Sequence, residues 1–500
     1  MTSIQAVEGI QQQVAETKTP MINEDATRCL NYTTKSVTDE KGNERAIKIP
    51  LPFDQVIERL ITISQDKLAR VDTLMFCKPD TSGEEIQFLE KASDLFGRLG
   101  VLNRSVIDWT TATGAMKQTE AFSELLMRLP KYRGIETAPH YPPMPDLFYN
   151  HPSLPDADHD ALADLLDRFS PETDKDRALI LAMFLTALWG GGEGQRPAFI
   201  LTSPDGRGSG KSTLGEMIAA LLGQDYIASS TKQEMKELIT RLLSPAGLMS
   251  RVVLFDNETG RVSSSELSGL ITAQNVSGRR LYEGEGHRPN NLLWIITLNS
   301  PTLDSDLASR GVAVSLKRPD YAPDWRTEML SMIDDKRWEI IAALIDLLST
   351  KTETIDTATR WGSWENGVLA KVQHYHDDVG GLQDLIVERQ RDFDDEADEV
   401  QLIRSGFIEA IEKNDVDPRI HPCFFKNSFA ASIYNEATGA RVRKNTALRE
   451  LKNLIRAGSI SELQENRRGA FGRGLLWVED TAVGGDDLTK LIMWKENEDN

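Results

Sequence analysis

A glycine-rich segment followed by Lys-Ser-Thr carries the clearest chemical signal in this sequence. Residues 199–202 form an apolar run, and the turn behind it ends in the string GKST at residues 210–213. The amphipathic pattern of residues 214–222 predicts a helix directly after the turn. Glycines let successive backbone N–H groups surround phosphate oxygens, and a helix N-terminus adds a favourable dipole. A strand, a glycine-rich turn and a helix in this order therefore predict a phosphate-binding loop, or P-loop.

The roles of a P-loop assign the expected ligands. We expect Lys211 to contact the β- and γ-phosphates of ATP, and the Ser212 hydroxyl to ligate Mg²⁺. The other predicted nucleotide-binding residues are Gly206, Gly208, Ser209, Gly210 and Thr213. Asp205 stands where the usual GxxxxGK[ST] string has its first glycine, and a glycine follows it at position 206. The alternative interpretation is a glycine-rich turn that binds no nucleotide.

Two more apolar strands are expected to end in polar residues. One leads into Asp256-Asn257-Glu258, and the strand at residues 292–298 leads into Asn299. A buried strand ending in Asp256 is typical of a Walker B motif, whose aspartate holds Mg²⁺ through water. Glu258 is predicted to orient the attacking water, and Asn299 to sense the γ-phosphate. The alternative in each case is a buried strand with an incidental polar end.

Arg310 follows this second strand and precedes an apolar run at residues 312–316. An arginine at this place is the usual site of an arginine finger. Such a finger completes the ATP site of a neighbouring subunit and stabilises charge on the transferring phosphoryl group. The prediction implies a ring of subunits with head-to-tail contacts. A surface salt bridge is the alternative, and Arg318 is a weaker candidate for a related role.

Residues 278–290 are rich in glycine and polar side chains, which predicts a hairpin between the two motif strands. In ring translocases such a hairpin projects into the central pore and contacts the phosphate backbone. The predicted nucleic-acid contacts of this hairpin are Arg279, Arg280, His287 and Arg288. A solvated hairpin without a ligand is the alternative.

The order of these motifs resembles that of superfamily 3-like helicases within the AAA+ class, especially the ATPase part of phage and mobile-element primase-helicases. The resemblance covers residues 154–319, about a third of the chain. It rests on the motifs at residues 208–213, 255–258, 297–299 and 307–310. The family implies a hexameric ring that moves along DNA using ATP and Mg²⁺. Asp205 and Asn257 depart from the family pattern.

The last hundred residues are predicted to form a nucleic-acid-binding winged helix. Residues 441–473 hold nine basic and three acidic side chains, in a chain whose net charge is −20. A helix at residues 445–457, a strand at 459–463, a basic turn and a strand at 474–478 match that layout. The predicted contacts are Arg443, Lys444, Arg449, Lys452, Arg467 and Arg468. A winged fold used for protein contacts or ring assembly is the alternative.

Length and composition set the frame for these sites. The chain has 500 residues, of which 40% are hydrophobic and 27% charged, which excludes wholesale disorder. Its longest mostly apolar run, at residues 178–189, is shorter than the roughly 20 residues of a membrane span. The three cysteines are widely separated, and the N-terminus lacks the pattern of a secretory signal. These features predict a cytoplasmic protein with no membrane segment.

The predicted fold class is α/β, with an AAA+-type P-loop NTPase core, an N-terminal α+β domain and a C-terminal winged-helix domain. The expected units are a loose segment (1–45), a small α+β domain (46–150), the P-loop ATPase (151–350), a helical and acidic connector (351–400) and the winged-helix domain (401–500).

The function predicted from these features is that of an ATP-dependent DNA helicase or translocase. It would act as a hexameric ring on single-stranded or forked DNA, in replication of a phage or mobile element. One alternative is a DNA-bound ATPase switch or loader without unwinding activity. The other is a protein-remodelling AAA+ ATPase. Tyr282 is the only aromatic residue in the predicted hairpin, which argues mildly against an aromatic pore loop of that second kind.

Overall fold

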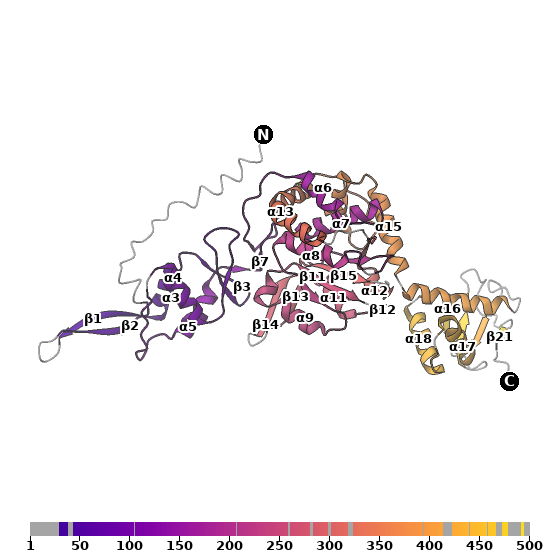
Figure 1. Cartoon of the computed structure of the whole chain (residues 1–500). Helices are drawn as coiled ribbons and strands as arrows, with labels where there is room; N and C mark the ends of the chain where they lie inside the picture. Colours follow the sequence, from indigo (N-terminus) through magenta and orange to yellow (C-terminus); the bar gives the residue numbers. More distant parts are fainter. Residues whose placement is uncertain are drawn as a thin grey trace.

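The computed structural model shows three bodies in chain order (Figure 1). It describes residues 30–38, 44–104, 106–206, 208–258, 261–280, 284–298, 302–318, 324–393, 395–413, 423–439, 441–457, 459–466, 473–478 and 492–494. Within these residues, no helix is both long enough and apolar enough to cross a membrane.

The central body is built on a five-stranded sheet in which all neighbouring strands are parallel. The strand order is β10 (Ile227–Ser229), β11 (Val252–Glu258), β15 (Leu293–Leu298), β9 (Ala198–Thr202) and β17 (Gly311–Ser315). Every residue of β9, β15 and β17 is buried, as expected for a parallel sheet covered on both faces. This confirms the prediction of a parallel α/β core.

Helices cover this sheet, and all of them except α10 share one apolar core with it (Figure 1). They are α6 (His159–Asp167), α7 (Asp174–Leu188), α8 (Lys211–Leu222), α9 (Met235–Leu242), α10 (Pro245–Leu248), α11 (Ser265–Thr272), α12 (Ser305–Ala308), α13 (Trp325–Ser349), α14 (Gly362–Gly367), the 3₁₀ helix η1 (Leu369–His374) and α15 (Val379–Asp392). Short pairings add β12 (Arg261–Val262) with β16 (Thr302–Leu303), and the hairpin of β13 (Asn275–Arg280) with β14 (Gly284–Pro289).

The prediction of a connector at residues 351–400 is wrong for most of that segment. Trp364 of α14 and Ile386 of α15 are fully buried in the central core. Asp176, which is buried in α7, forms an ion pair with Arg389 of α15 and accepts a hydrogen bond from the Ser315 backbone N–H at 2.7 Å. These helices carry many polar residues on their exposed faces, so the sequence did not indicate that their other faces are buried.

The N-terminal body contains a second, smaller sheet with helices packed against it. Its elements are β1 (Tyr32–Thr38), β2 (Glu44–Pro50), α3 (Phe53–Ile63), β3 (Leu68–Val71), β4 (Leu74–Cys77), β5 (Gln87–Leu89), α4 (Ala92–Leu102), α5 (Gln118–Arg128), β6 (Lys131–Tyr132), β7 (Gly134–Glu136) and β8 (Leu147–Tyr149). The expectation of a loose segment up to residue 45 is wrong where β1 pairs with β2. Residues 1–29 lie outside the described residues.

The C-terminal body has its own apolar core of helices and strands. Its elements are α16 (Asp395–Glu412), β18 (Cys423–Lys426), α17 (Asn427–Thr438), α18 (Lys444–Ala457), β19 (Leu463–Asn466), β20 (Gly474–Trp477) and β21 (Ile492–Trp494). The strands are ordered β19-β20-β18-β21. Helix α18 and strand β20 confirm the predicted elements, whereas the strand expected at 459–463 begins only at Leu463.

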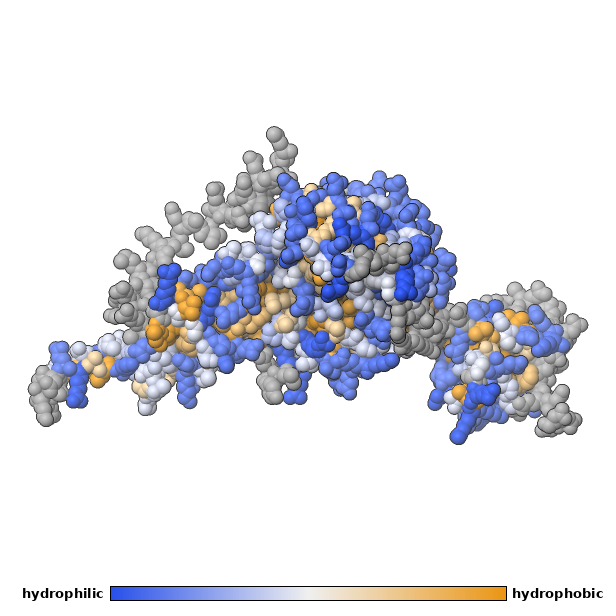
Figure 2. Space-filling model, viewed as in Figure 1, coloured by the Kyte–Doolittle hydropathy of each residue, from blue (hydrophilic) through white to orange (hydrophobic). Residues whose placement is uncertain are grey.

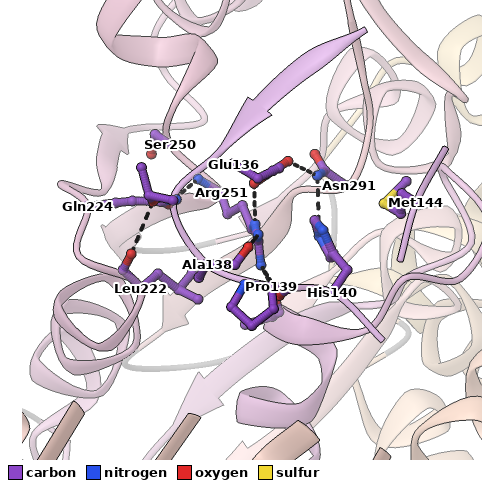
Figure 3. A network of polar contacts seen from close by, with 12 residues as sticks. Glu136, Ala138, Pro139, His140, Met144, Leu222, Gln224, Ser250, Arg251 and Asn291 are labelled. Carbon is purple, nitrogen blue, oxygen red and sulfur yellow. Dashed lines mark hydrogen bonds and ion pairs between the residues drawn. The ribbon is translucent and has the colours of Figure 1, made fainter. Parts of the chain in front are cut away.

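A buried polar network ties the end of the N-terminal body to the central sheet (Figure 3). Arg251 directly precedes β11, and its Nε lies 2.6 Å from the Glu136 carboxylate. Its Nη1 donates to the Ala187 carbonyl at 2.8 Å, and its Nη2 donates to the Ala138 carbonyl. Asn291 donates to the other oxygen of Glu136. A buried ion pair is retained only when hydrogen bonds satisfy its remaining atoms, and this network supplies them.

His140 belongs to the same network and is buried against it. Its Nδ1 lies 3.1 Å from the Tyr149 hydroxyl, and its Nε2 lies 3.4 Å from the Asn291 amide nitrogen. Burial lowers the pKa of His140 well below its ordinary value of 6.5, and the positive charge of Arg251 lowers it further. His140 is therefore neutral in the folded protein at neutral pH.

We expect Glu136→Gln to lower the free energy of unfolding by about 3–5 kcal/mol, because the charge of Arg251 would stay buried without its counterion. Denaturant titration of the full chain measures this loss. Glu409→Gln is the control, since Glu409 pairs with Lys413 on an exposed helix face and its loss should leave the midpoint unchanged. Equal midpoints for parent and Glu136→Gln would contradict the structural role of the pair.

His140 also predicts how stability changes with pH. Below pH 6.5 the unfolded chain binds a proton at His140 that the folded chain rejects, so stability is lost as the pH falls. We expect the drop in melting temperature between pH 7.5 and pH 5.5 to be smaller in His140→Gln than in the parent chain. Calorimetry at both pH values measures it, and identical drops would contradict the prediction.

Candidate functional site

The predicted nucleotide-binding residues meet at the carboxyl edge of the central sheet. All of them except Gly206 line a cavity of about 400 Å³. Its walls are Gly208, Ser209, Gly210, Lys211, Ser212, Thr213, Asp256, Asn257 and Thr297. Strand β15 lies between β9 and β11, so the ends of three strands converge here. In open parallel sheets, ligands bind at this edge.

The loop between β9 and α8 adopts a conformation that requires glycine. Gly206, Gly208 and Gly210 have φ angles of 73°, 84° and 81°, in the left-handed region. Side chains with a Cβ are strained there, which explains why a glycine at position 206 can serve although Asp205 occupies the motif's first position. Gly210 is the N-cap of α8, so the N-terminus of that helix faces the cavity.

Lys211 occupies the first position of α8 and is nearly buried. Its Nζ donates to the Gly206 carbonyl at 2.7 Å and to the Ser209 hydroxyl at 3.3 Å. Burial lowers the pKa of Lys211, and the charge of Asp256 opposes that shift. A cation thus lies inside a loop whose backbone geometry suits an anion.

Asp256 lies opposite the loop, at the end of β11. Its Oδ1 accepts hydrogen bonds from the Ser212 hydroxyl and, at 2.9 Å, from the Thr297 hydroxyl. Thr297 also accepts from the Asn257 backbone N–H at 2.6 Å. Sequence reasoning assigned Thr297 no role of its own, although it lies in the same motif as Asn299. The signal available in the sequence was a hydroxyl two residues before Asn299.

Glu258 is the predicted catalytic residue that the structure places elsewhere. It is buried, and it is not among the residues that line the cavity. Both of its carboxylate oxygens accept hydrogen bonds from Thr231, one from the backbone N–H at 2.7 Å and one from the hydroxyl at 2.6 Å. The register of β11 with β15 shifts between Phe255 and Glu258, and Asn257 has a φ of 57°. This bulge turns Asn257 to the cavity and Glu258 away from it.

Of the remaining predicted catalytic residues, Arg310 is not among those that line this cavity. Asn299 lies outside the described residues. Arg310 forms an ion pair with Asp306, four residues before it, and its side chain is 12% exposed. Burial lowers the pKa of Arg310, as does the charge of Arg360. Arg318 lies beside the P-loop of its own chain, where its Nε would be 3.6 Å from a Cβ on Gly208.

The hairpin predicted at residues 278–290 is present as β13 and β14, but two of its four basic residues are buried. Arg280 donates to the Thr73 hydroxyl at 2.9 Å and lies 3.7 Å from the Asp72 carboxylate. Arg288 donates to the Ser250 carbonyl at 3.0 Å, and burial lowers its pKa to about 10. Both predictions of nucleic-acid contact are therefore wrong for this conformation, because these side chains hold the hairpin to its surroundings. Arg279 and His287 are exposed.

Several of the basic side chains predicted to contact nucleic acid in the C-terminal body form ion pairs within that body. Lys452 and Arg456 both pair with Glu465, and Arg449 pairs with Glu450. Arg443 and Lys444 are exposed at the start of α18, whereas Arg467 and Arg468 lie outside the described residues. The apolar face of α18 is as predicted, with Leu451 buried beneath it.

No protein-family model matches this chain, and no curated protein matches it. Several solved structures are similar to it. The A-form apo structure of the NrS-1 C-terminal region has 13% identity and a TM-score of 0.45, and the match covers 82% of this chain and 95% of that one. Another apo structure of that region has 14% identity and a TM-score of 0.43, covering 83% and 96%. JCV helicase bound to a small molecule has 14% identity and a TM-score of 0.26, covering 46% and 64%.

The contact between Thr231 and Glu258 allows a test of whether Glu258 has a structural role. We expect Thr231→Val to lower the free energy of unfolding by about 1–3 kcal/mol, because one oxygen of the buried carboxylate loses its hydroxyl donor. Urea titration measures this loss. Thr240→Val is the control, since the Thr240 hydroxyl lies at the surface and donates only to the backbone carbonyls of Lys236 and Arg279. A variant as stable as the parent would contradict the structural role.

Proposed function

We propose that this chain is a Mg²⁺-dependent ATPase, and that it couples hydrolysis to movement on DNA. The observation that carries the proposal is the cavity in which a glycine-rich loop, Lys211, Ser212 and Asp256 face one another. Backbone N–H groups, a lysine and a helix N-terminus converge on one point, which is the environment that a triphosphate requires.

The oxygen atoms beside the loop suit Mg²⁺. The Ser212 hydroxyl and the Asp256 carboxylate are hard oxygen ligands of the kind this ion prefers, and Thr297 holds the carboxylate in place. When bound, the ion neutralises charge on the phosphates. Lys211 would exchange its present bonds to the loop for bonds to phosphate oxygens.

In this mechanism, Asn257 takes the role that the sequence analysis predicted for Glu258. Asn257 lines the cavity next to Asp256. An amide side chain can hydrogen-bond a water molecule and hold it in line with the phosphate. Phosphoryl transfer depends mainly on positioning and electrostatic stabilisation, so a residue that positions water without taking its proton is sufficient.

DNA would bind at exposed basic residues, and a neighbouring subunit would complete the ATP site. Lys444 is the first residue of α18 and Arg443 directly precedes it; α18 follows α17 in the chain and precedes the β19–β20 pair. This order of elements supports a winged helix whose second helix faces DNA. Arg310 would act in trans in a head-to-tail ring, after release from Asp306, with Asn299 near the γ-phosphate.

The buried state of Arg280 and Arg288 favours a second candidate function. A hairpin that holds these arginines inside the chain presents less charge to a DNA strand than a translocating loop needs. In this alternative the protein is a DNA-bound ATPase switch or loader, which hydrolyses ATP without unwinding a duplex.

Steady-state ATP hydrolysis with and without single-stranded DNA tests the proposal. We expect Lys211→Ala and Asp256→Asn to lower the rate by about 100-fold or more, because the first removes a cation that stabilises the phosphoryl group and the second removes the carboxylate that would hold Mg²⁺. Lys232→Ala is the matched control on an exposed turn. Glu258→Gln is expected to retain most of the catalytic rate per folded molecule, in contrast to Asp256→Asn.

Three outcomes separate the candidates. Hydrolysis that rises with DNA, together with strand displacement, supports the translocase. Hydrolysis on DNA without strand displacement supports the switch or loader. If Lys211→Ala hydrolyses ATP as fast as the parent chain, the cavity is not the active site and the proposal fails.

A further inference from the structure

The β1–β2 hairpin projects from the N-terminal body into solvent (Figure 1). Its strands are paired from Tyr32 opposite Pro50 to Thr38 opposite Glu44. Beyond Tyr32 and Pro50, every residue of both strands is exposed. An isolated two-stranded hairpin is marginally stable in water, because it lacks a layer to cover its apolar face. A surface that covers this face would stabilise it.

The base of the hairpin is fixed to the body, so its direction is defined. Lys48 Nζ lies 4.2 Å from the centre of the Tyr32 ring and 3.2 Å from the Asp108 carboxylate. The Tyr32 hydroxyl donates to the same carboxylate. Asn31 donates to the Thr110 carbonyl at 2.8 Å and accepts from the Thr110 N–H at 2.8 Å. These contacts hold the base of the hairpin in place, so the rest of the arm extends away from its own chain.

One face of the arm carries all three of its exposed large apolar side chains, beside Thr33, Lys35 and Arg45. Lys35 is opposite Ile47, so Val37, Ile47 and Ile49 share a face by the two-residue alternation of strands. Their exposed fractions are 41%, 45% and 38%. With the arm in water, these three β-branched side chains stay exposed on one face, and apolar side chains that gather on a surface mark an interface.

The N-terminal body carries a second apolar surface, on the adjacent helices α3 and α5. Phe53 is 50% exposed on α3, and Met127 is 68% exposed on α5. Figure 2 shows hydrophobic residues on the hairpin and on this adjoining body. Of the twelve exposed large apolar side chains in the described residues, eight lie between residues 37 and 127. Apolar exposure is therefore concentrated in this body.

The two surfaces also carry opposite charge. The docking face of the arm holds Lys35 and Arg45, whereas Lys48 lies on the opposite face and pairs with Asp108. The exposed acids of α3 and α5 are Asp54, Glu58, Glu120 and Glu124, against two arginines. Complementary charge favours and orients contact between two such surfaces.

We propose that the β1–β2 hairpin is an assembly arm, which docks by its Val37–Ile47–Ile49 face on the α3–α5 surface of a second copy of this chain. The arm points away from its own helices, so the contact is between copies. Because the arm and its acceptor are different surfaces, the contact is head-to-tail and can close a ring. This inference goes beyond the proposed ATPase and does not depend on nucleotide or DNA.

Disulfide crosslinking between two differently labelled chains tests the contact directly. In a Cys29→Ser background, one chain carries Val37→Cys and the other carries Met127→Cys. Cys77 and Cys423 are buried, so they should not react. Under mild oxidation without nucleotide, we expect a crosslinked dimer in the mixture and little in either chain alone. No dimer in the mixture, or equal crosslinking of Val37→Cys with itself, would overturn the proposed acceptor.

A second measurement compares assembly of face variants by sedimentation. Ile47→Thr with Ile49→Thr keeps β-branched residues, so the strand is retained while its apolar face is lost. We expect assembly to weaken by about tenfold or more. Ala46→Thr, on the opposite face of β2, is the matched control and should assemble like the parent.

Two results of the sedimentation measurement would refute the proposed role of the arm. A parent chain that sediments as a 55.8 kDa monomer at all concentrations would show that copies do not assemble. A double variant that assembles normally but binds single-stranded DNA more weakly would make the arm a DNA contact. Failure of ATP hydrolysis in either variant would not bear on the arm, since assembly is measured without ATP.

Discussion

The buried ion pair between Arg251 and Glu136 is the contact on which the arrangement of this molecule depends. It fixes the chain that leaves the N-terminal body against the start of β11, and the far end of β11 carries Asp256. Separating the two bodies would leave a buried charge without its partner, at a large cost in free energy, so the pair fixes their relative position. His140 and Asn291 complete the network, and the neutral state of His140 makes it sensitive to acid. The candidate site thus has a rigid support on the side opposite its cavity.

At the other end of β11, a bulge decides which side chains can act. The register shift after Phe255 and the left-handed Asn257 place Asp256 and Asn257 at the cavity, while Glu258 is bound to Thr231. Strand geometry alone would have put Asp256 and Glu258 on the same face. The chain therefore presents one carboxylate and one amide to the proposed nucleotide. This composition favours positioning of water over removal of its proton.

The arginines of this protein divide by burial into two groups with different roles. Arg196, Arg251 and Arg288 are buried and donate to backbone carbonyls, and burial lowers the pKa of Arg196 and Arg288 to about 10. These side chains hold loops and strands together. The exposed group includes Arg443 at the start of α18 and Arg45 in the arm. Members of this second group present their charge at the surface of the molecule.

Local sequence patterns were enough to predict the main features of the central body. The glycine-rich loop, helix α8, the apolar strands and the β13–β14 hairpin follow from glycine chemistry and hydrophobic periodicity, which act over a few residues. Tertiary structure alone decided the rest. It buried Arg280 and Arg288, turned Glu258 from the cavity, and packed α14 and α15 into the core. Each of these outcomes depends on residues distant in the chain, such as Asp72 for Arg280 and Asp176 for Arg389. Charge and spacing along one segment carry no information about which distant partner will neutralise it.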